Sequence, residues 1–208
     1  WMGEIMSIDT FSMSVPQIFG HLQNLLVSQQ FLQKKGIGNE VPFFICPFSP
    51  KITVEVERQT QVLINYLSKQ NIHVLEINLY DIANEILKKR DILNKIFAME
   101  QDISKEQLKE LLQNVLDSEA HLIPEISRVL DKNLFDILFI TGIGEVFPYI
   151  RSHNVLNNLQ STAKDKPTVM FFPGEYTHSL VSGASLDLFG VLHDDKYYRA
   201  FNIFHCEF

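Results

Sequence analysis

Short runs of β-branched, aromatic and other apolar residues alternate along the chain with longer segments whose apolar residues recur every three or four positions. The short runs are typical of strands covered on both faces of a sheet, and the longer period is typical of amphipathic helices. Five strands are predicted, at residues 41–48, 72–79, 137–140, 168–172 and 197–204. Because helical segments separate them, the pattern predicts an α/β fold, with a mainly parallel, Rossmann-like sheet of about five strands flanked by helices.

Residues that cap helices and break strands mark the ends of several elements. Ser14 as a cap and Pro16 in the first turn predict an N-terminal helix within residues 14–35. Further along, the pair at 173–174, Pro-Gly, is predicted to end the fourth strand. The small, polar residues 176–183 that follow are predicted to form a loop over the edge of the sheet.

Residues 80–131, between the second and third predicted strands, contain two to three predicted helices. One of these helices opens with a capping box formed by Ser104 and Gln107. Since one helix is enough for a crossover between parallel strands, the remaining helices predict an insertion. We expect residues 1–208 to form one α/β domain, with the helical insertion offering a surface for a partner protein.

The stretch 135–159 contains the best candidate for a functional site, because a predicted strand, a glycine-containing polar turn and a predicted helix follow one another there. Ligands of parallel α/β sheets usually bind at the carboxyl ends of the strands, where such a turn lies. Gly142 is expected to be needed for a positive φ or for close approach of the backbone. Six residues of the turn and the following helix are the candidates: Thr141, Gly142, Gly144, Glu145, Arg151 and His153.

Two interpretations of these six residues are open. In the first, Arg151 binds a phosphate or a carboxylate at the start of the helix. In the second, the residues are structural: Glu145 pairs with Arg151, and His153 holds the neighbouring backbone. Structural ion pairs are common in turns of this kind, so we favour the second interpretation.

The charge balance argues against a dedicated nucleic-acid surface. The chain of 208 residues has 18 basic and 25 acidic residues, a net charge of -7, whereas binding to phosphates needs clustered lysine and arginine. The densest basic cluster, at residues 88–90, is predicted to be a solvated helix face. Pro42 and Pro47 interrupt the most apolar stretch, so no membrane span is expected. Two widely separated cysteines indicate reduced thiols and a cytoplasmic protein.

Known catalytic and nucleotide-binding motifs are missing from the sequence. There is no phosphate-binding Gly-x-x-x-x-Gly-Lys loop, no Gly-x-Ser-x-Gly nucleophile turn and no helical histidine pair for a metal. Gly142 and Gly144 follow a strand, but the third glycine of a dinucleotide-binding turn is absent. We therefore expect no catalytic residue, no metal and no cofactor. A degenerate nucleotide- or phosphate-binding domain with a regulatory role is the alternative.

Six sequence blocks carry a family resemblance that runs in order through nearly the whole chain. The most specific is Thr-Gly-Ile-Gly-Glu-Val-Phe-Pro-Tyr-Ile-Arg-Ser-His at residues 141–153. The others are at residues 38–45, 78–81, 156–160, 170–174 and 197–201. Together they resemble the signature blocks of the BrxB family, the small component of bacteriophage-exclusion (BREX) defence systems of bacteria.

The resemblance implies a role in antiphage defence beside a site-specific adenine methyltransferase, a large ATPase and the alkaline-phosphatase-like protein PglZ. It implies a non-enzymatic adaptor or assembly factor, with PglZ as the expected direct partner and other BREX proteins as further partners. It supplies no catalytic residues. An acidic chain of this kind is expected to meet DNA only indirectly, through its partners.

Overall fold

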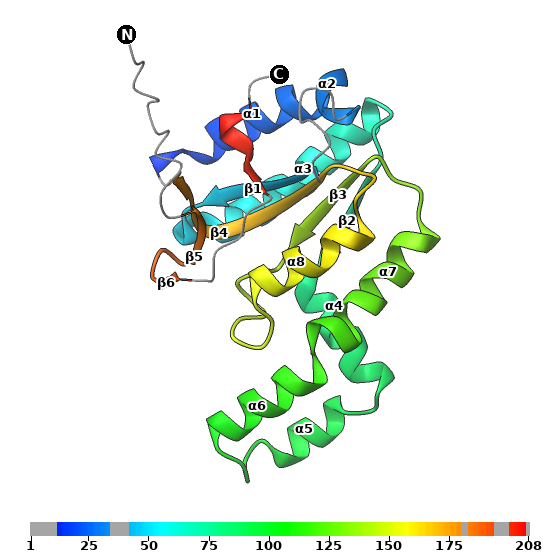
Figure 1. Cartoon of the computed structure of the whole chain (residues 1–208), viewed down its shortest axis with the longest axis vertical. Coiled ribbons are helices and arrows are strands. Elements are labelled where there is room, and N and C mark those ends of the chain that lie inside the picture. Colours follow the sequence, from blue (N-terminus) through cyan, green and yellow to red (C-terminus); the bar gives the residue numbers. More distant parts are fainter. Residues whose placement is uncertain (1–11, 34–41, 180–182, 194–199, 207–208) are drawn as a thin grey trace.

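The computed structural model describes residues 12–33, 42–179, 183–193 and 200–206, and in it a sheet lies between two layers of helices (Figure 1). Five strands run parallel in the order β2-β3-β4-β1-β7, and β5 and β6 extend the sheet in antiparallel pairing from β4. The parallel strands are β1 (Phe43–Phe48), β2 (Val74–Asn78), β3 (Ile137–Thr141), β4 (Thr168–Ser179) and β7 (Phe201–Asn202). The predicted α/β fold with a mainly parallel sheet is confirmed.

The chain crosses the sheet in two directions. From β1 it passes through α3 (Thr53–Lys69) to the edge strand β2, and it then steps back through β3 to β4. The apolar residues of α3 pack on one face of the sheet, whereas those of α8 (Ser152–Thr162), between β3 and β4, pack on the other. The crossover from β1 and the crossover from β3 run in opposite directions across the sheet and on opposite faces of it. They therefore have the same hand, as expected for parallel strands.

Alternate residues of each central strand point into two separate cores. In β1, Phe43 and Ile45 face the side of the sheet covered by α4, α7 and α8, and Phe44, Cys46 and Phe48 face α1 and α3. These five side chains are at most 3% exposed. Burial on both faces explains why the strand appears in the sequence as an unbroken apolar run.

The N-terminal helical segment, predicted as one helix within 14–35, consists of two helices. They are α1 (Val15–Leu26) and α2 (Gln29–Leu32). The break occurs at Ser28, whose hydroxyl oxygen accepts a hydrogen bond from the backbone N–H of Phe31 at 3.2 Å and so caps α2. Residues 34–35 lie outside the described ranges.

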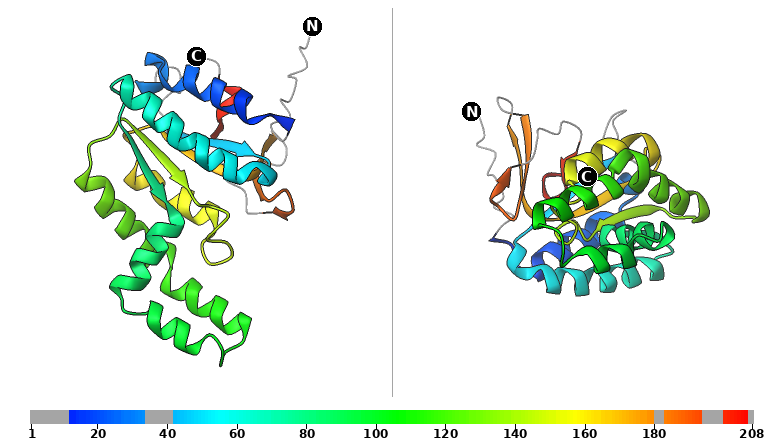
Figure 2. Two further views of the ribbon diagram at one scale, coloured as in Figure 1. Left: turned by 180° about the vertical axis from the view of Figure 1, so that it is seen from behind. Right: turned by 90° about the horizontal axis from the view of Figure 1, so that it is seen from below.

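The segment between β2 and β3 is helical, as the predicted insertion requires, but it holds more helices than the two to three expected. It comprises α4 (Leu79–Lys89), α5 (Leu93–Met99), α6 (Lys105–Val115), the π-helical turn η3 (Ser118–Leu122) and α7 (Ile123–Lys132). The predicted capping box opens α6, where the Gln107 N–H donates to the Ser104 hydroxyl. Figures 1 and 2 show α5 and α6 extending from the end of the molecule farthest from α1.

The prediction that Pro173-Gly174 ends the fourth strand is wrong, and the loop predicted at 176–183 is wrong for residues 176–179 and 183, which belong to strands. Residues 180–182 lie outside the described ranges. Strand β4 continues to Ser179 and pairs with β5 (Gly183–Leu188), which in turn pairs with β6 (Leu192–His193). Pro173 is the last β4 residue opposite β1, and Gly174 is the first opposite β5. A Cβ at Gly174 would lie 2.3 Å from the carbonyl oxygen of Asp187. At the Pro-Gly pair β4 therefore changes its pairing partner from β1 to β5, and glycine allows the β5 backbone to approach closely.

The outer predicted strands are shorter in the structure. Asn78 ends β2 because its side chain caps α4, accepting a hydrogen bond from the Tyr80 N–H at 2.9 Å. At the C-terminal end, 197–204 was predicted as one strand, but β7 covers Phe201–Asn202 and a 3-10 turn, η4 (Ile203–His205), follows it. Asn202 caps that turn through a hydrogen bond from the Phe204 N–H. Residues 41 and 197–199 lie outside the described ranges.

The basic cluster at 88–90 was predicted to be solvated, but two of its residues, Lys89 and Arg90, contact other helical segments. Lys89 of α4 and Arg128 of α7 both form ion pairs with Glu125. Arg90 donates from Nη1 to the carbonyl oxygen of Val115 at 2.9 Å. The hydrogen bonds from Arg128 and then Lys89 lower the pKa of Glu125 from 4.5 to about 2, against an opposing effect of desolvation. Glu125 thus links α4 and α7, two of the helices that pack on the same face of the sheet as α8.

Replacing Glu125 by glutamine should lower the free energy of unfolding by about 1 kcal/mol at pH 7, the upper value for partly exposed ion pairs. Because its pKa is lowered in the folded state, Glu125 stabilises the fold above about pH 4.5 and loses that effect as the pH falls toward 2. Urea unfolding of wild type and Glu125→Gln across this range measures the difference. Exposed Glu119 provides the control, Glu119→Gln. A deficit that stays constant with falling pH would contradict the role of the ion pairs.

Candidate functional site

A cavity of about 660 Å³ opens at the carboxyl ends of β1 to β4. The strand order changes direction between β1 and β4, and such a switch point is where ligands of open α/β sheets bind. One wall is the first half of α3, and the opposite wall is the turn after β3. The lining residues are Phe48, Thr53, Val54, Val56, Glu57, Arg58, Thr60, Gln61, Glu76, Asn78, Thr141, Gly142, Ile143, Gly144, Glu145, Phe171, Pro173 and Phe189.

The turn after β3 approaches the cap of α4 so closely that only glycine fits at position 142. Gly142 has a φ of +74°, and a Cβ built on it would lie 2.4 Å from Oδ1 of Asn78. That oxygen is occupied, because it accepts hydrogen bonds from the backbone N–H groups of Tyr80 and Asp81. The expected need for glycine at this position is confirmed on both grounds, backbone conformation and close approach.

Glu76 lies beneath the turn and is half-buried in the middle of β2. Its two carboxylate oxygens accept hydrogen bonds from the Thr141 hydroxyl, at 2.9 Å, and from the side-chain amide of Gln61. Both donors are neutral, so they hold the carboxylate in place without neutralising its charge. Sequence analysis missed Glu76 and Gln61, although an acidic residue inside the apolar run of β2 was a visible signal.

A second pair of carboxyl groups meets at the rim of the cavity. Glu145, from the turn, and Glu57, from α3, share a hydrogen bond. Partial burial raises the pKa of Glu145, and the negative charges of Glu57 and Asp81 raise it further. The guanidinium of Arg58, which also lines the cavity, donates to Glu55 on the same helix. The cavity therefore carries a negative potential, which disfavours a phosphate and favours a cation.

The structure divides the six predicted site residues into two groups. Thr141, Gly142, Gly144 and Glu145 line the cavity. Arg151, exposed at the N-cap of α8, and His153, half-buried in the first turn of that helix, do not. A phosphate held by Arg151 would thus lie outside the cavity. The pairing of Glu145 with Arg151 stays a prediction.

The two cysteines lie outside the lining of the cavity. Burial raises the pKa of the Cys46 thiol far above its ordinary range and that of Cys206 to about 11, so both thiols stay protonated at neutral pH. Among the residues that the structure describes, no three or more histidine, cysteine or acidic side chains are grouped to hold a metal ion. Within the same ranges, no helix combines the length and the apolar character needed to cross a membrane.

Alanine at position 142 should destabilise the fold by at least about 1–2 kcal/mol, the cost of a positive φ for a residue with a Cβ, with the contact to Asn78 adding to it. Gly20 is the matched control: it lies inside α1, and a Cβ there meets nothing within 4 Å. Gly20→Ala should therefore stabilise the fold by about 0.5–1 kcal/mol. Urea unfolding of both variants measures the difference. Equal shifts of the two midpoints would contradict the constraint at Gly142.

Comparisons with known proteins identify the family. The family model described as "BREX protein BrxB" matches residues 75–203. A Bacillus cereus (strain H3081.97) protein named "BREX protein BrxB" is 35% identical over 180 residues, which cover 86% of this chain and 91% of that protein. An Escherichia coli O9:H4 (strain HS) protein of the same name is 26% identical over 182 residues, 88% of each chain. The comparison with solved structures gives no match. The chain belongs to the BrxB family of BREX phage-defence proteins.

Proposed function

We propose that this protein is a non-enzymatic adaptor or assembly factor of a BREX system, and that it binds PglZ directly. The observation that carries the proposal is the pair of helices α5 and α6, which extends from the sheet instead of covering it (Figure 1). A projecting helical pair with its own exposed side chains is a means of reaching a second protein. Membership of the BrxB family supplies the biological setting.

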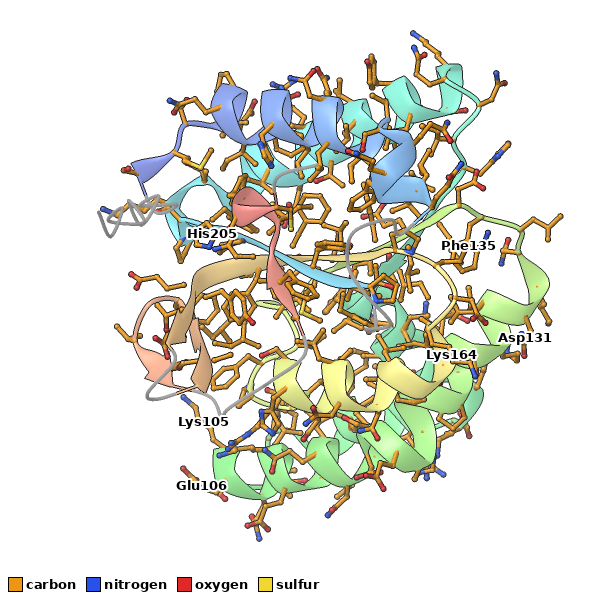
Figure 3. The ribbon with its side chains drawn as sticks, turned by 45° about the horizontal axis from the view of Figure 1, so that its top comes forward. Lys105, Glu106, Asp131, Phe135, Lys164 and His205 are labelled. Carbon is orange, nitrogen blue, oxygen red and sulfur yellow. The ribbon has the colours of Figure 1, made fainter. Side chains whose placement is uncertain are left out.

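The projecting helices present apolar surface that the chain itself leaves uncovered. Phe97 is 62% exposed and Met99 is 44% exposed, both on α5. On α6, Lys105 and Glu106 lie at the outer end of the molecule (Figure 3). Aromatic and methionine side chains surrounded by polar residues are the common composition of protein–protein interfaces. We therefore assign the PglZ contact to the outer surface of α5.

Tagged protein expressed with the complete defence operon should retain PglZ at physiological salt. Phe97→Asp combined with Met99→Asp should reduce that retention roughly tenfold or more, because a buried aromatic anchor contributes about 2 kcal/mol to binding. Quantitative mass spectrometry of the purified complexes measures the retention. Leu134→Asp is the control, since Leu134 is fully exposed (100%) outside α5.

Two outcomes of this experiment are informative in different ways. If the wild-type chain retains no BREX protein, the adaptor function is wrong. If it retains PglZ and the α5 double variant retains as much, the contact lies on another surface of the chain.

The alternative is a degenerate nucleotide- or phosphate-binding domain with a regulatory role. The position of the cavity at the switch point favours it, but Glu57, Glu76 and Glu145 in the lining oppose a phosphate. We expect no heat beyond dilution when ATP, GTP or a dinucleotide is added to millimolar concentration. Isothermal calorimetry makes the measurement, and a saturable enthalpy would favour the alternative over the adaptor.

A further inference from the structure

We propose that the cavity at the carboxyl edge of the sheet binds a segment of a partner protein in which a lysine or arginine lies beside apolar residues. The inference rests on the proposed function, since it takes for granted that the chain acts by holding other proteins. It adds a second docking surface, on elements other than α5, and it specifies the chemistry of the segment that docks there.

The walls of the cavity are apolar and partly exposed. Val54 of α3 is 79% exposed and Phe189 is 38% exposed, and both line the cavity. Below them, Phe48 and Phe171 are each 3% exposed and also belong to the lining. Large exposed apolar side chains in a concave site are typical of a surface that another molecule covers.

Phe189 is held in a backbone conformation that does not suit phenylalanine. Its φ is +57°, in the turn between β5 and β6, where glycine, asparagine or aspartate is usual. Its N–H donates to the Pro173 carbonyl oxygen at 2.8 Å, and its ring meets the edge of the Phe147 ring, with centroids 6.5 Å apart. Strained backbone that persists beside a cavity suggests that the side chain has a function there. We assign Phe189 the role of apolar contact for the partner segment.

The carboxyl groups determine the charge of the occupant. Glu57, Glu76 and Glu145 come from α3, β2 and the turn after β3, and they converge on one cavity. Glu57 and Glu145 lie within hydrogen-bonding distance of each other, and Glu76 accepts hydrogen bonds from two neutral donors, the Thr141 hydroxyl and the Gln61 amide. A cation placed between these groups would relieve their mutual repulsion. Arg58, the one basic residue among the described residues of the lining, is paired with Glu55, so the cavity combines apolar walls with an excess of negative charge.

A protein segment fits this combination better than a free ion or a small polar cation. Lysine and arginine have an apolar stem and a charged end, so one side chain matches both the walls and the carboxyl groups. The volume of about 660 Å³ leaves room for a neighbouring apolar side chain against Val54 and Phe189. A bare metal ion would leave those walls without a contact.

The test is photo-crosslinking in cells that carry the complete operon. The crosslinking residue p-benzoylphenylalanine replaces Val54 in the tagged chain, and in the control it replaces Leu134, which is fully exposed (100%) and outside the cavity. We expect position 54 to capture a BREX protein through a peptide that contains lysine or arginine beside apolar residues. We expect no such product from position 134.

Variants then show which features of the cavity hold the segment. Glu57→Gln with Glu145→Gln should lower the yield of the position-54 product about tenfold, because the rim loses its carboxyl groups and with them its negative charge. Glu119→Gln with Asp131→Asn replaces the same number of carboxyl groups at exposed residues outside the cavity and should leave the yield unchanged; Asp131 lies on α7 (Figure 3).

Phe189→Asn separates a binding role from a structural one. Asparagine tolerates a positive φ, so the variant should unfold at the same or a higher urea concentration than wild type. Without the ring it should nevertheless give several-fold less crosslinked product. A purely structural phenylalanine would produce the opposite pattern, with lower stability and unchanged crosslinking.

The outcomes separate this inference from the adaptor function. If wild type retains PglZ but position 54 captures no protein, captures a small molecule, or captures a peptide without lysine or arginine, the cavity assignment is wrong and the adaptor function stands. Unchanged crosslinking in the Glu57→Gln and Glu145→Gln double variant also overturns it. If wild type retains no BREX protein, the adaptor function is wrong and the inference falls with it.

Discussion

Both faces of a parallel sheet have to be covered, and in this protein that constraint determines where a cavity can form. The strands β1, β3 and β4 are apolar on both sides, so helices must pack on each face. Crossovers between parallel strands have the same hand. The chain can therefore place helices on both faces only if it reverses its direction across the sheet. The reversal lies between β1 and β4, since the chain leaves β1 toward α3 on one face and leaves β3 toward α8 on the other. The cavity is a consequence of covering the sheet.

The same crevice holds phosphates in many α/β proteins, yet its residues in this chain have the opposite charge preference. A phosphate site uses a glycine turn that leads directly into a helix, so that backbone N–H groups and the helix dipole meet the anion. Here the glycine turn continues into Glu145, and α8 begins only at Ser152. The turn that packs so closely on the cap of α4 carries Glu145, which lines the cavity together with Glu57 and Glu76. A familiar ligand position has thereby become suited to a cation.

The helices between β2 and β3 divide their roles between covering the sheet and extending beyond it. Ion pairs through Glu125 join α4 and α7, whereas α5 and α6 project (Figure 2). Because the projecting pair and the cavity belong to different elements, the chain presents two separate surfaces. The adaptor function that we propose needs at least two such surfaces, and each can be altered by surface substitutions that leave the buried sheet intact.

The sequence by itself determined the features that depend on local residues. The apolar runs predicted the parallel strands, the pair Ser104 and Gln107 predicted the start of α6, and the turn after the third strand predicted a glycine that tolerates no side chain. These signals are local because caps, turns and alternation act over a few neighbouring residues. Four of the six candidate residues also line the cavity.

Tertiary structure decided the strand order, the pairing of β4 with β5 and the character of the site. Pro173-Gly174 looked like the end of a strand in the sequence. Its glycine is needed because the backbone of Asp187 lies close to it, and Asp187 belongs to β5, which comes later in the chain. Glu57 and Glu145 are 88 residues apart in the sequence, and no sequence pattern predicts that they meet. Their convergence arises only when α3 and the turn after β3 meet above the sheet, since contacts between distant segments are set by packing and leave no local pattern.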